Sequence, residues 1–365
     1  MASTVWVNKA ALTEAQVHDD TLPALGDGEV RLRIESFSVT ANNITYAVIG
    51  DMFGYWNFFP AEGDYGPGEA KYGIVPMWGH AVVEQSQQPD IAVGERVYGY
   101  LPMGTHLDVL PGKVSGSGFT DMAAHRQPMS PIYNQYSRLA ADPEHDPAKE
   151  AERMLFGPLF KTGFLIEAML RREGWFGAQN LIMTSASSKT SMGLASVAKD
   201  LSPDVRRIGL TSKGNVDFVV QTGLYDEVAA YEDVSNLPDV ASVSVDFAGN
   251  STLLRSIHET LGDSLKYSCL VGATHVDARG VGGGGEMPGP KPILFFAPDH
   301  AVATVQELGP KGFGEAVGTS WKNFLGAVDG VVRVDERAGI QTAIPAFTDT
   351  LQGKAEPAVG IIIRP

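Results

Sequence analysis

The sequence predicts an α/β protein in which a β-rich first half precedes a doubly wound parallel sheet. In the first hundred residues, runs such as 29–35 alternate apolar and polar side chains, which is typical of half-buried strands. After residue 174, short apolar runs alternate with helical stretches, and this pattern indicates right-handed βαβ units. A chain of 365 residues is long enough to hold two domains.

The composition excludes several classes of function. A formal net charge of −15 argues against nucleic acid and anionic membranes as partners. No run of eighteen apolar residues occurs, so we expect a cytoplasmic protein that does not enter a membrane. The single cysteine, Cys269, excludes an internal disulfide and a multi-cysteine zinc site, and we expect it in the core.

The first half contains three clear strand patterns, at 29–35, 81–84 and 95–100. Residues 52–71 hold many aromatic side chains among glycines and prolines: Phe53, Tyr55, Trp56, Phe58, Phe59 and Tyr65. Two interpretations stay open for this segment, a loop over a pocket and a plain aromatic cluster beneath a long loop. Residues 111–131 are rich in Gly, Ser and Met, and we expect them to be irregular.

The second half alternates helices and strands. Asp146-Pro147 is a typical helix start, and the four-residue spacing of Phe160, Phe164 and Ala168 predicts an amphipathic helix over 158–172. A further helix is expected over 191–200, and strands are expected at 181–183, 207–210, 242–247, 268–271, 293–296 and 358–363. Residues 280–292 are too rich in Gly and Pro for regular structure, so a mobile lid and a surface loop both remain open.

An anion site is predicted where the strand at 181–183 gives way to a helix. The N-terminus of a helix presents unpaired N–H groups and a positive dipole end, which attract a phosphate. This turn carries hydroxyls and one lysine in place of most of the usual glycines: Ser187, Ser188, Lys189, Thr190 and Ser191. For the serines, the competing interpretation is a role as helix N-cap.

Two further strand ends are polar, and doubly wound sheets bind ligands at the carboxyl ends of their strands. The second strand is followed by Thr211, Ser212, Lys213 and Asn215. An NAD site normally has an acidic residue there, whereas hydroxyls and an ammonium favour the 2′-phosphate of NADP(H). The third strand end, with Phe247, Ala248, Gly249 and Asn250, is suited to lie beside the nicotinamide ribose.

Two other nucleotide sites share this pattern and are disfavoured. The run 188–190 is like the lysine-hydroxyl end of a P-loop, but Met183 and Ser188 stand where that loop needs glycine. A methyl-donor enzyme would need an acidic residue after the second strand, where this chain has hydroxyls.

The order of these parts resembles the medium-chain dehydrogenase/reductase superfamily. The resemblance rests on 29–35 followed by Asn42-Asn43, on the segment 76–84 with its histidine, and on the turn and strand at 93–99. It implies a GroES-like catalytic domain over 1–155, completed by 325–365, a Rossmann nucleotide-binding domain over 156–324, and a homodimer. The nucleotide half resembles a divergent branch of unassigned function.

Departures from the superfamily pattern bear on the chemistry. The zinc-dependent alcohol dehydrogenases of the superfamily place a cysteine where Asn43 falls and a glutamate where this chain has Ala81. Because His80 alone cannot hold a catalytic zinc, we expect no metal and a similarity to the zinc-free quinone and enone reductases.

Hydride can pass from a nicotinamide to an activated alkene or a quinone without a metal, provided that the protein donates hydrogen bonds to the developing oxyanion. The candidate donors are Asn43, Tyr46, Tyr55 and His80. For the tyrosines the alternative is a core position with a wet hydroxyl, and His80 is expected to be hydrogen-bonded in a structural role. Lys161 and Thr162 either reach the nicotinamide ribose or lie at the surface.

The sequence therefore predicts a zinc-independent, NADPH-dependent oxidoreductase that reduces an aromatic, quinone-like or α,β-unsaturated carbonyl compound. The aromatic residues between 53 and 65 favour an apolar or aromatic small-molecule substrate. Two alternatives stay open: a redox-neutral lyase with a resident dinucleotide, and a non-catalytic binding or sensor protein that retains the dinucleotide site.

Overall fold

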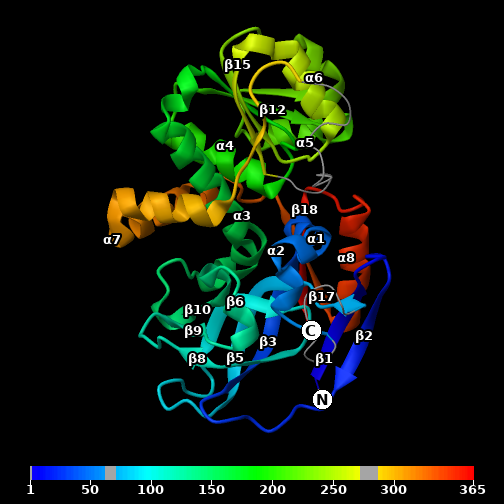
Figure 1. Ribbon diagram of the computed structural model, residues 1–365, viewed down its shortest axis with the longest axis vertical. Helices are drawn as coiled ribbons and strands as arrows, with labels where there is room; N and C mark the ends of the chain where they lie inside the picture. The colour runs from blue at the N-terminus through cyan, green and yellow to red at the C-terminus, as the bar shows by residue number, and fades with distance from the viewer. Residues whose placement is uncertain (1, 62–70, 272–286) are drawn as a thin grey trace. The chain divides into compact units, whose positions relative to one another are not determined.

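The computed structural model describes residues 2–61, 71–271 and 287–365, and the chain separates into two compact units. Unit 1 comprises Met1–Leu155 and Arg333–Pro365, and unit 2 comprises Phe156–Val332 (Figure 1). The sequence analysis had placed the second boundary at 324/325. The contacts place it later because helix α7 (Ala297–Ala327) packs within unit 2.

Unit 1 is built on a nine-stranded and a three-stranded sheet. The larger sheet has the order β17-β18-β3-β5-β6-β10-β9-β8, with β7 paired to β3, and the smaller has the order β2-β1-β4. The strands are β1 (Ala2–Asn8), β2 (Ala15–Asp20), β3 (Val30–Val39), β4 (Tyr72–Gly73), β5 (Pro76–Ser86), β6 (Arg96–Pro102), β7 (His106–Val109), β8 (Pro111–Gly112), β9 (Gly118–Asp121), β10 (Gln135–Arg138), β17 (Arg333–Ala338) and β18 (Val359–Arg364).

The strands predicted from period-two patterns are confirmed as β3, β5 and β6. In β3 the alternating apolar residues Val30, Leu32 and Ile34 are all buried, so the pattern reflects one face turned to the core. The predicted C-terminal strand is β18, which pairs antiparallel with β3 and thereby returns the end of the chain to unit 1.

The prediction that residues 111–131 are irregular is wrong in part, because the segment contains β8 and β9. β9 pairs with β10, which follows it in the chain, so its regularity depends on a partner outside the segment. Gly118 allows this pairing, since a Cβ there would lie 2.2 Å from the carbonyl oxygen of Tyr136.

The aromatic segment of unit 1 is folded into short helical turns rather than a plain loop. Helices α1 (Ala41–Val48) and α2 (Gly50–Phe53) lead into a 3-10 turn, η1 (Tyr55–Asn57). The side chains of Tyr55, Trp56, Phe58 and Phe59 are buried, which favours the aromatic-cluster interpretation. Residues 62–70, with Tyr65, lie outside the described residues. Helix α8 (Ala343–Leu351) also belongs to unit 1.

Unit 2 confirms the doubly wound sheet. Its six parallel strands have the order β13-β12-β11-β14-β15-β16, so the chain runs outward from β11 first in one direction and then in the other. The strands are β11 (Asn180–Met183), β12 (Arg206–Thr211), β13 (Glu227–Ala230), β14 (Ser242–Asp246), β15 (Leu265–Leu270) and β16 (Ile293–Leu294). The helices are α4 (Lys189–Leu201), α5 (Val216–Gln221), α6 (Ser251–Leu261) and α7.

Helix α3 (Glu150–Arg172) begins earlier than the predicted 158–172. Asp146 caps the 3-10 turn that precedes it, with its carboxylate accepting from the N–H of Ala148 at 2.9 Å. Pro158 lies inside the helix and cannot donate to the carbonyl of Met154. The Ser38 hydroxyl donates to that carbonyl instead, at 2.8 Å, so the break in the helix ladder is satisfied.

The remaining predictions concern single segments. Cys269 is buried in β15, as expected. The predicted strand 293–296 is reduced to β16, and residues 287–292 have no helix or strand, while 280–286 lie outside the described residues. Among the helices that the structure describes, none is both long and apolar enough to cross a membrane.

Candidate functional site

The turn between β11 and α4 has a strained, closely held backbone. Ser185 adopts φ of 49°, in the left-handed region that favours glycine, and its N–H donates to the hydroxyl of Tyr231 at 3.2 Å. Ser188 is the N-cap of α4, with its Oγ accepting from the N–H of Ser191 at 3.3 Å. The N-cap interpretation is therefore confirmed for Ser188, which fixes where the helix begins.

Side chains from the first two strand ends meet at the same edge of the sheet. The Thr211 hydroxyl donates to Ser187 Oγ at 3.4 Å, and Asn215 Nδ2 donates to the same oxygen at 3.3 Å. They meet because β11 and β12 are parallel neighbours. Ser212 and Lys213 follow in exposed positions, and Lys213 makes no ion pair with any described residue.

Lys189 is the first residue of α4, where the positive end of the helix dipole disfavours a cation. Its side chain is half-buried, with Nζ 6.0 Å from the ring centroid of Phe156, and burial lowers the pKa of Lys189 to about 8. Within the described residues no carboxylate pairs with it. An ammonium held in this position is suited to an anion that the chain does not itself supply.

The two residues that follow Lys189 in the first turn of α4 differ in how accessible they are to a ligand. Thr190 is half-buried. Ser191 is buried, and its Oγ lies 2.9 Å from the hydroxyl of Tyr225, which donates to the carbonyl of Ala186 at 2.7 Å. The hydroxyl of Ser191 is therefore engaged in holding the turn.

The third strand end is tied to the first by a buried carboxyl group. Thr184 Oγ1 donates to Asp246 Oδ1 at 2.5 Å, and burial raises the pKa of Asp246. The N–H groups of Phe247 and Ala248 donate to Thr184 Oγ1 at 2.9 and 3.1 Å. Gly249 follows with φ of 63°, which suits a residue without Cβ.

Asn250 caps helix α6. Its Oδ1 accepts from the N–H groups of Thr252 and Leu253 at 3.0 and 3.1 Å. Lys161 and Thr162 are half-buried on α3, between Phe160 and Gly163, and both of these flanking residues lie against α4. A Cβ on Gly163 would lie 2.5 Å from the backbone nitrogen of Leu194.

In unit 1, the polar groups of Asn43 are used within the fold. Its side chain is 1% exposed, and Oδ1 accepts from the N–H and the hydroxyl of Thr40 at 2.7 and 3.2 Å. Nδ2 donates to the carbonyl of Pro76 at 2.9 Å, which ties α1 to β5. Asn43 is therefore engaged in holding helix α1 in place.

Tyr46 has a different environment. Its hydroxyl accepts from Asn42 Nδ2 at 2.6 Å and from Trp78 Nε1 at 3.1 Å. Burial raises the pKa of Tyr46, and these two hydrogen bonds oppose that rise. Its ring centroid lies 4.5 Å from that of Tyr55, whose hydroxyl is 3.1 Å from the hydroxyl of Tyr133.

The structure thus gathers a set of side chains that we call the tyrosine cluster: Tyr46, Tyr55, Tyr100, Tyr133 and Trp78. The rings of Tyr100 and Tyr133 are 4.9 Å apart, and those of Tyr100 and Trp78 are 5.0 Å apart. Sequence reasoning found Tyr46 and Tyr55 and missed the other three, because they come from separate strands and a distant 3-10 turn, Pro131–Asn134. The only local signal was the aromatic character of β6.

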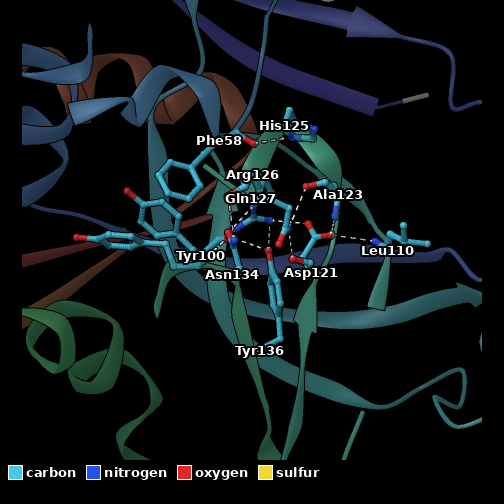
Figure 2. A network of polar contacts seen from close by, with 11 residues as sticks. Phe58, Tyr100, Leu110, Asp121, Ala123, His125, Arg126, Gln127, Asn134 and Tyr136 are labelled. Carbon is cyan, nitrogen blue, oxygen red and sulfur yellow. Dashed lines mark hydrogen bonds and ion pairs between the residues drawn. The ribbon is translucent and has the colours of Figure 1, made fainter. Parts of the chain in front are cut away.

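A buried arginine holds Tyr133 and Tyr100 in place; Figure 2 shows it with Asp121, Tyr136 and Tyr100. The guanidinium of Arg126, 1% exposed, pairs with Asp121 at 2.8 Å and donates to the carbonyl of Tyr133 at 2.8 Å. It also donates to the hydroxyl of Tyr136 at 2.9 Å, which donates to the carbonyl of Tyr100 at 2.6 Å. This network fixes the backbone at two positions of the tyrosine cluster, and Asp121 neutralises the charge of Arg126.

His80 lies in β5 and is fully buried. Neither ring nitrogen has a hydrogen-bond partner among the described residues, so the prediction of a hydrogen-bonded histidine is wrong. The ring instead packs near Tyr98, with centroids 5.2 Å apart, because β5 is covered on both faces. Burial lowers the pKa of His80 to about 3, so it stays neutral at physiological pH.

The described residues contain no group of three or more His, Cys, Asp or Glu side chains that could hold a metal ion. The functional groups that the two sites present are hydroxyls, amides, one half-buried lysine and aromatic rings.

A family model described as "Protein of unknown function (DUF2855)" matches residues 37–356. The chain belongs to this family. A search of curated proteins gave no significant match to this DUF2855 chain.

Several solved structures share the fold of the DUF2855 chain. CurA from Vibrio vulnificus, in complex with NADPH, has a TM-score of 0.56 at 15% identity, covering 99% of this chain and 98% of CurA. The yhdH oxidoreductase from Salmonella enterica, in complex with NADP, has a TM-score of 0.57 at 11% identity over 100% of both chains. A putative NADPH:quinone reductase from Bacillus thuringiensis has a TM-score of 0.55 at 13% identity, covering 100% of this chain and 99% of that one. These likenesses confirm the predicted medium-chain dehydrogenase/reductase fold.

Proposed function

We propose that this protein is an NADPH-dependent oxidoreductase that reduces an apolar, quinone-like or α,β-unsaturated carbonyl compound. The observation that carries the proposal is the meeting of Ser187, Thr211 and Asn215 at one edge of the parallel sheet, beside the exposed Lys213. Doubly wound sheets bind dinucleotides along the carboxyl edge of their strands, across the point where the strand order reverses, and this point lies beside the strand that precedes Ser187, between β11 and β14.

The pyrophosphate of the dinucleotide binds at the N-terminus of α4. The N–H groups there and the Lys189 ammonium supply positive charge, and the half-buried position of Lys189 strengthens a charge-assisted hydrogen bond. Ser212 and Lys213, both exposed, hold the 2′-phosphate, since no acidic side chain follows β12 directly, and the buried Thr211 supports them by holding Ser187 in place. That CurA and the yhdH oxidoreductase were crystallised with NADPH and NADP supports this choice of coenzyme.

The nicotinamide half contacts the third strand end. Phe247, Ala248 and Gly249 offer a chain segment of small side chains at the end of β14, and Asn250 keeps its Nδ2 for a ribose oxygen because only its Oδ1 caps α6. Lys161 and Thr162 are the candidates for a second ribose contact.

The bound coenzyme supplies the hydride, and the tyrosine cluster receives the substrate. Its aromatic faces contact a flat apolar molecule, and the phenolic O–H groups of Tyr46 and Tyr55 donate to the carbonyl oxygen as it gains negative charge. A conjugated carbonyl delocalises that charge, so no metal is needed. His80 and Asn43 take supporting roles, because the first is neutral and buried and the second has its polar groups engaged.

The first test is fluorescence titration of the protein with NADPH and NADH, followed by assays of NADPH oxidation with a panel of quinones and enones. Tyr46→Phe should lower kcat about 100-fold, the usual effect of removing one oxyanion donor. Tyr72→Phe, a tyrosine of β4 outside the cluster, is the matched control. Binding without NADPH oxidation would favour the redox-neutral lyase or the sensor, and the absence of binding would refute the proposal.

The expected homodimer forms part of this proposal. Ile293 and Leu294 in β16, the edge strand of the unit 2 sheet, are 51% and 49% exposed. An apolar edge with unpaired backbone groups is suited to pairing with a second copy. Light scattering should give a dimer mass, and Ile293→Lys should shift it to that of a monomer.

A further inference from the structure

We propose that Asn42 and Trp78 are positioning residues that make the Tyr46 hydroxyl an obligate donor toward an uncharged carbonyl or quinone oxygen of the substrate. The inference rests on the proposed function and concerns how its substrate site works. It assigns a role to two residues that the sequence analysis did not single out.

The hydrogen-bonding capacity of a phenol limits what the Tyr46 hydroxyl can do. A tyrosine hydroxyl has one proton to donate and two lone pairs with which to accept. In Tyr46 both lone pairs are occupied, by Asn42 Nδ2 at 2.6 Å and by Trp78 Nε1 at 3.1 Å. The remaining capacity of this hydroxyl is donation.

The two donors are held in place by secondary structure. Asn42 and Tyr46 are four residues apart on α1, so their side chains lie on the same face of the helix. Trp78 comes from β5, which Asn43 ties to the same helix through the carbonyl of Pro76. An indole N–H can donate only, so the Trp78 contact cannot be reversed.

The Tyr46 hydroxyl donates to no carbonyl or carboxylate among the described residues; its neighbour is the hydroxyl of Tyr100, and their interaction opposes the rise in the Tyr46 pKa that burial causes. The Tyr100 hydroxyl is itself fully buried and makes no well-formed hydrogen bond within the described residues. In contrast, the hydroxyls of Tyr55 and Tyr133 can satisfy one another at 3.1 Å. Tyr46 and Tyr100 therefore keep at least one phenolic proton between them that lacks an acceptor, and a buried donor without a partner is costly unless a ligand supplies one.

The missing acceptor is a neutral oxygen rather than a carboxylate. Arg126, which lies behind the cluster, is paired with Asp121 and donates to Tyr133, Asn134 and Tyr136 as well. A carboxylate would enter this aromatic site without a counter-charge, which is strongly unfavourable. A quinone or enone oxygen needs only the donors that are present.

The decisive variant is Asn42→Asp, which keeps the shape of the side chain but replaces its donor with an acceptor. The carboxylate should draw the Tyr46 proton to itself and away from the substrate. With NADPH and 9,10-phenanthrenequinone, we expect kcat at pH 7.5 to fall about 100-fold, the effect of losing one oxyanion donor, while KM for NADPH changes less than threefold.

The matched control for charge is Ala41→Asp, which places the same carboxylate at the neighbouring exposed position of α1. Trp78→Phe should lower kcat about tenfold, because one of the two supporting N–H groups is lost. Trp6→Phe removes an indole that also donates to a hydroxyl, that of Thr4, away from the cluster, and should leave kcat unchanged.

A pH profile separates positioning from mere damage to the fold. Below the pKa of the introduced carboxyl group, that group becomes an O–H donor to Tyr46, so the activity of Asn42→Asp should recover as the pH falls toward 5. The titratable groups that face Tyr46 are Tyr55, Tyr100 and Tyr133, and burial raises the pKa of each, so they do not titrate in this range.

An activity-independent measurement keeps the two hypotheses distinguishable. In protein labelled with [¹³Cζ]tyrosine, the resonance lost in Tyr46→Phe is that of Tyr46, and it should move downfield in Asn42→Asp but not in Ala41→Asp. An unmoved resonance, or an unchanged kcat in an active wild type, overturns the inference. If no quinone or enone is reduced but the resonance moves, the proposed reductase fails and the donor arrangement of Tyr46 stands.

Discussion

The two candidate regions differ in how many of their polar groups already have a hydrogen-bond or ion-pair partner within the described chain. At the turn between β11 and α4, the hydroxyls of Ser187 and Thr211 hydrogen-bond weakly to one another at 3.4 Å and Ser185 is strained. No carboxylate in the described part of the chain pairs with Lys189. In the tyrosine cluster, the hydroxyl oxygens of Tyr46, Tyr55 and Tyr133 have hydrogen-bond partners and the guanidinium of Arg126 is paired behind them, so that phenolic protons are what remains for a ligand.

The contrast teaches that the two regions recognise ligands by different means. The turn in unit 2 offers net positive charge and accessible hydroxyls, which bind a phosphate of almost any carrier. The tyrosine cluster offers directed O–H groups in an apolar frame, which select for the position of a single oxygen. The predictions below test each side of this contrast.

The largest effect should come from breaking the buried pair behind the tyrosine cluster. Asp121→Asn leaves the Arg126 charge uncompensated in the core, and it should lower the free energy of unfolding by about 3–5 kcal/mol. Chemical denaturation monitored by fluorescence measures it.

Glu227→Gln is the matched control for this variant, because it breaks the exposed pair with Arg206 and should cost less than about 1 kcal/mol. Equal losses for the two variants would show that burial of the Arg126 pair carries no special weight.

The second effect concerns the half-buried lysine. Lys189→Gln should raise the Kd for NADPH about 10- to 100-fold, since a charge-assisted hydrogen bond to phosphate is lost. Because burial lowers the pKa of Lys189 to about 8, the wild type should lose NADPH affinity as the pH rises from 7 to 9 and the ammonium gives up its proton. Lys189→Gln should lack this pH dependence, and its persistence would assign the titration to another group.

The third effect concerns the choice of coenzyme. Lys213→Glu should weaken NADPH at least tenfold more than NADH, because the new carboxylate repels the 2′-phosphate that only NADPH carries. Isothermal titration of both coenzymes measures the ratio. Equal loss for NADPH and NADH would refute the assignment of Lys213.

The smallest effect concerns the strained serine. Ser185→Gly should raise the free energy of unfolding by about 0.4–1 kcal/mol at most, because glycine adopts a positive φ without strain. Thermal unfolding measures it, and the Kd for NADPH should stay within twofold. A marked loss of affinity would show that the Ser185 hydroxyl itself contacts the coenzyme.

Much of unit 2 was predictable from sequence because its determinants are local. Each parallel strand is a short buried run, and the side chains after it lie at the same edge of the sheet by the rules of the βαβ unit, which brought Thr211 and Asn215 to Ser187. β13 was missed, since Glu227–Ala230 is short and lacks large apolar side chains.

Unit 1 was less predictable because its site joins distant residues. The pairing of β5 with β6 and the hydrogen bonds of Arg126 bring together Trp78, Tyr100 and Tyr133. Neither contact can be predicted from the spacing of residues in the sequence. The roles of Asn43 and His80 were likewise hidden, because they depend on which backbone groups lie within reach of each side chain.

By itself, the sequence determined the fold class, most strands of the parallel sheet and the polar strand ends, since periodicity and chain direction are properties of local segments. Only the tertiary structure decided which hydroxyls remain free to act. That outcome depends on which lone pairs and protons are already taken by neighbours in space, as Trp78 of β5 takes one lone pair of the Tyr46 oxygen from 32 residues away.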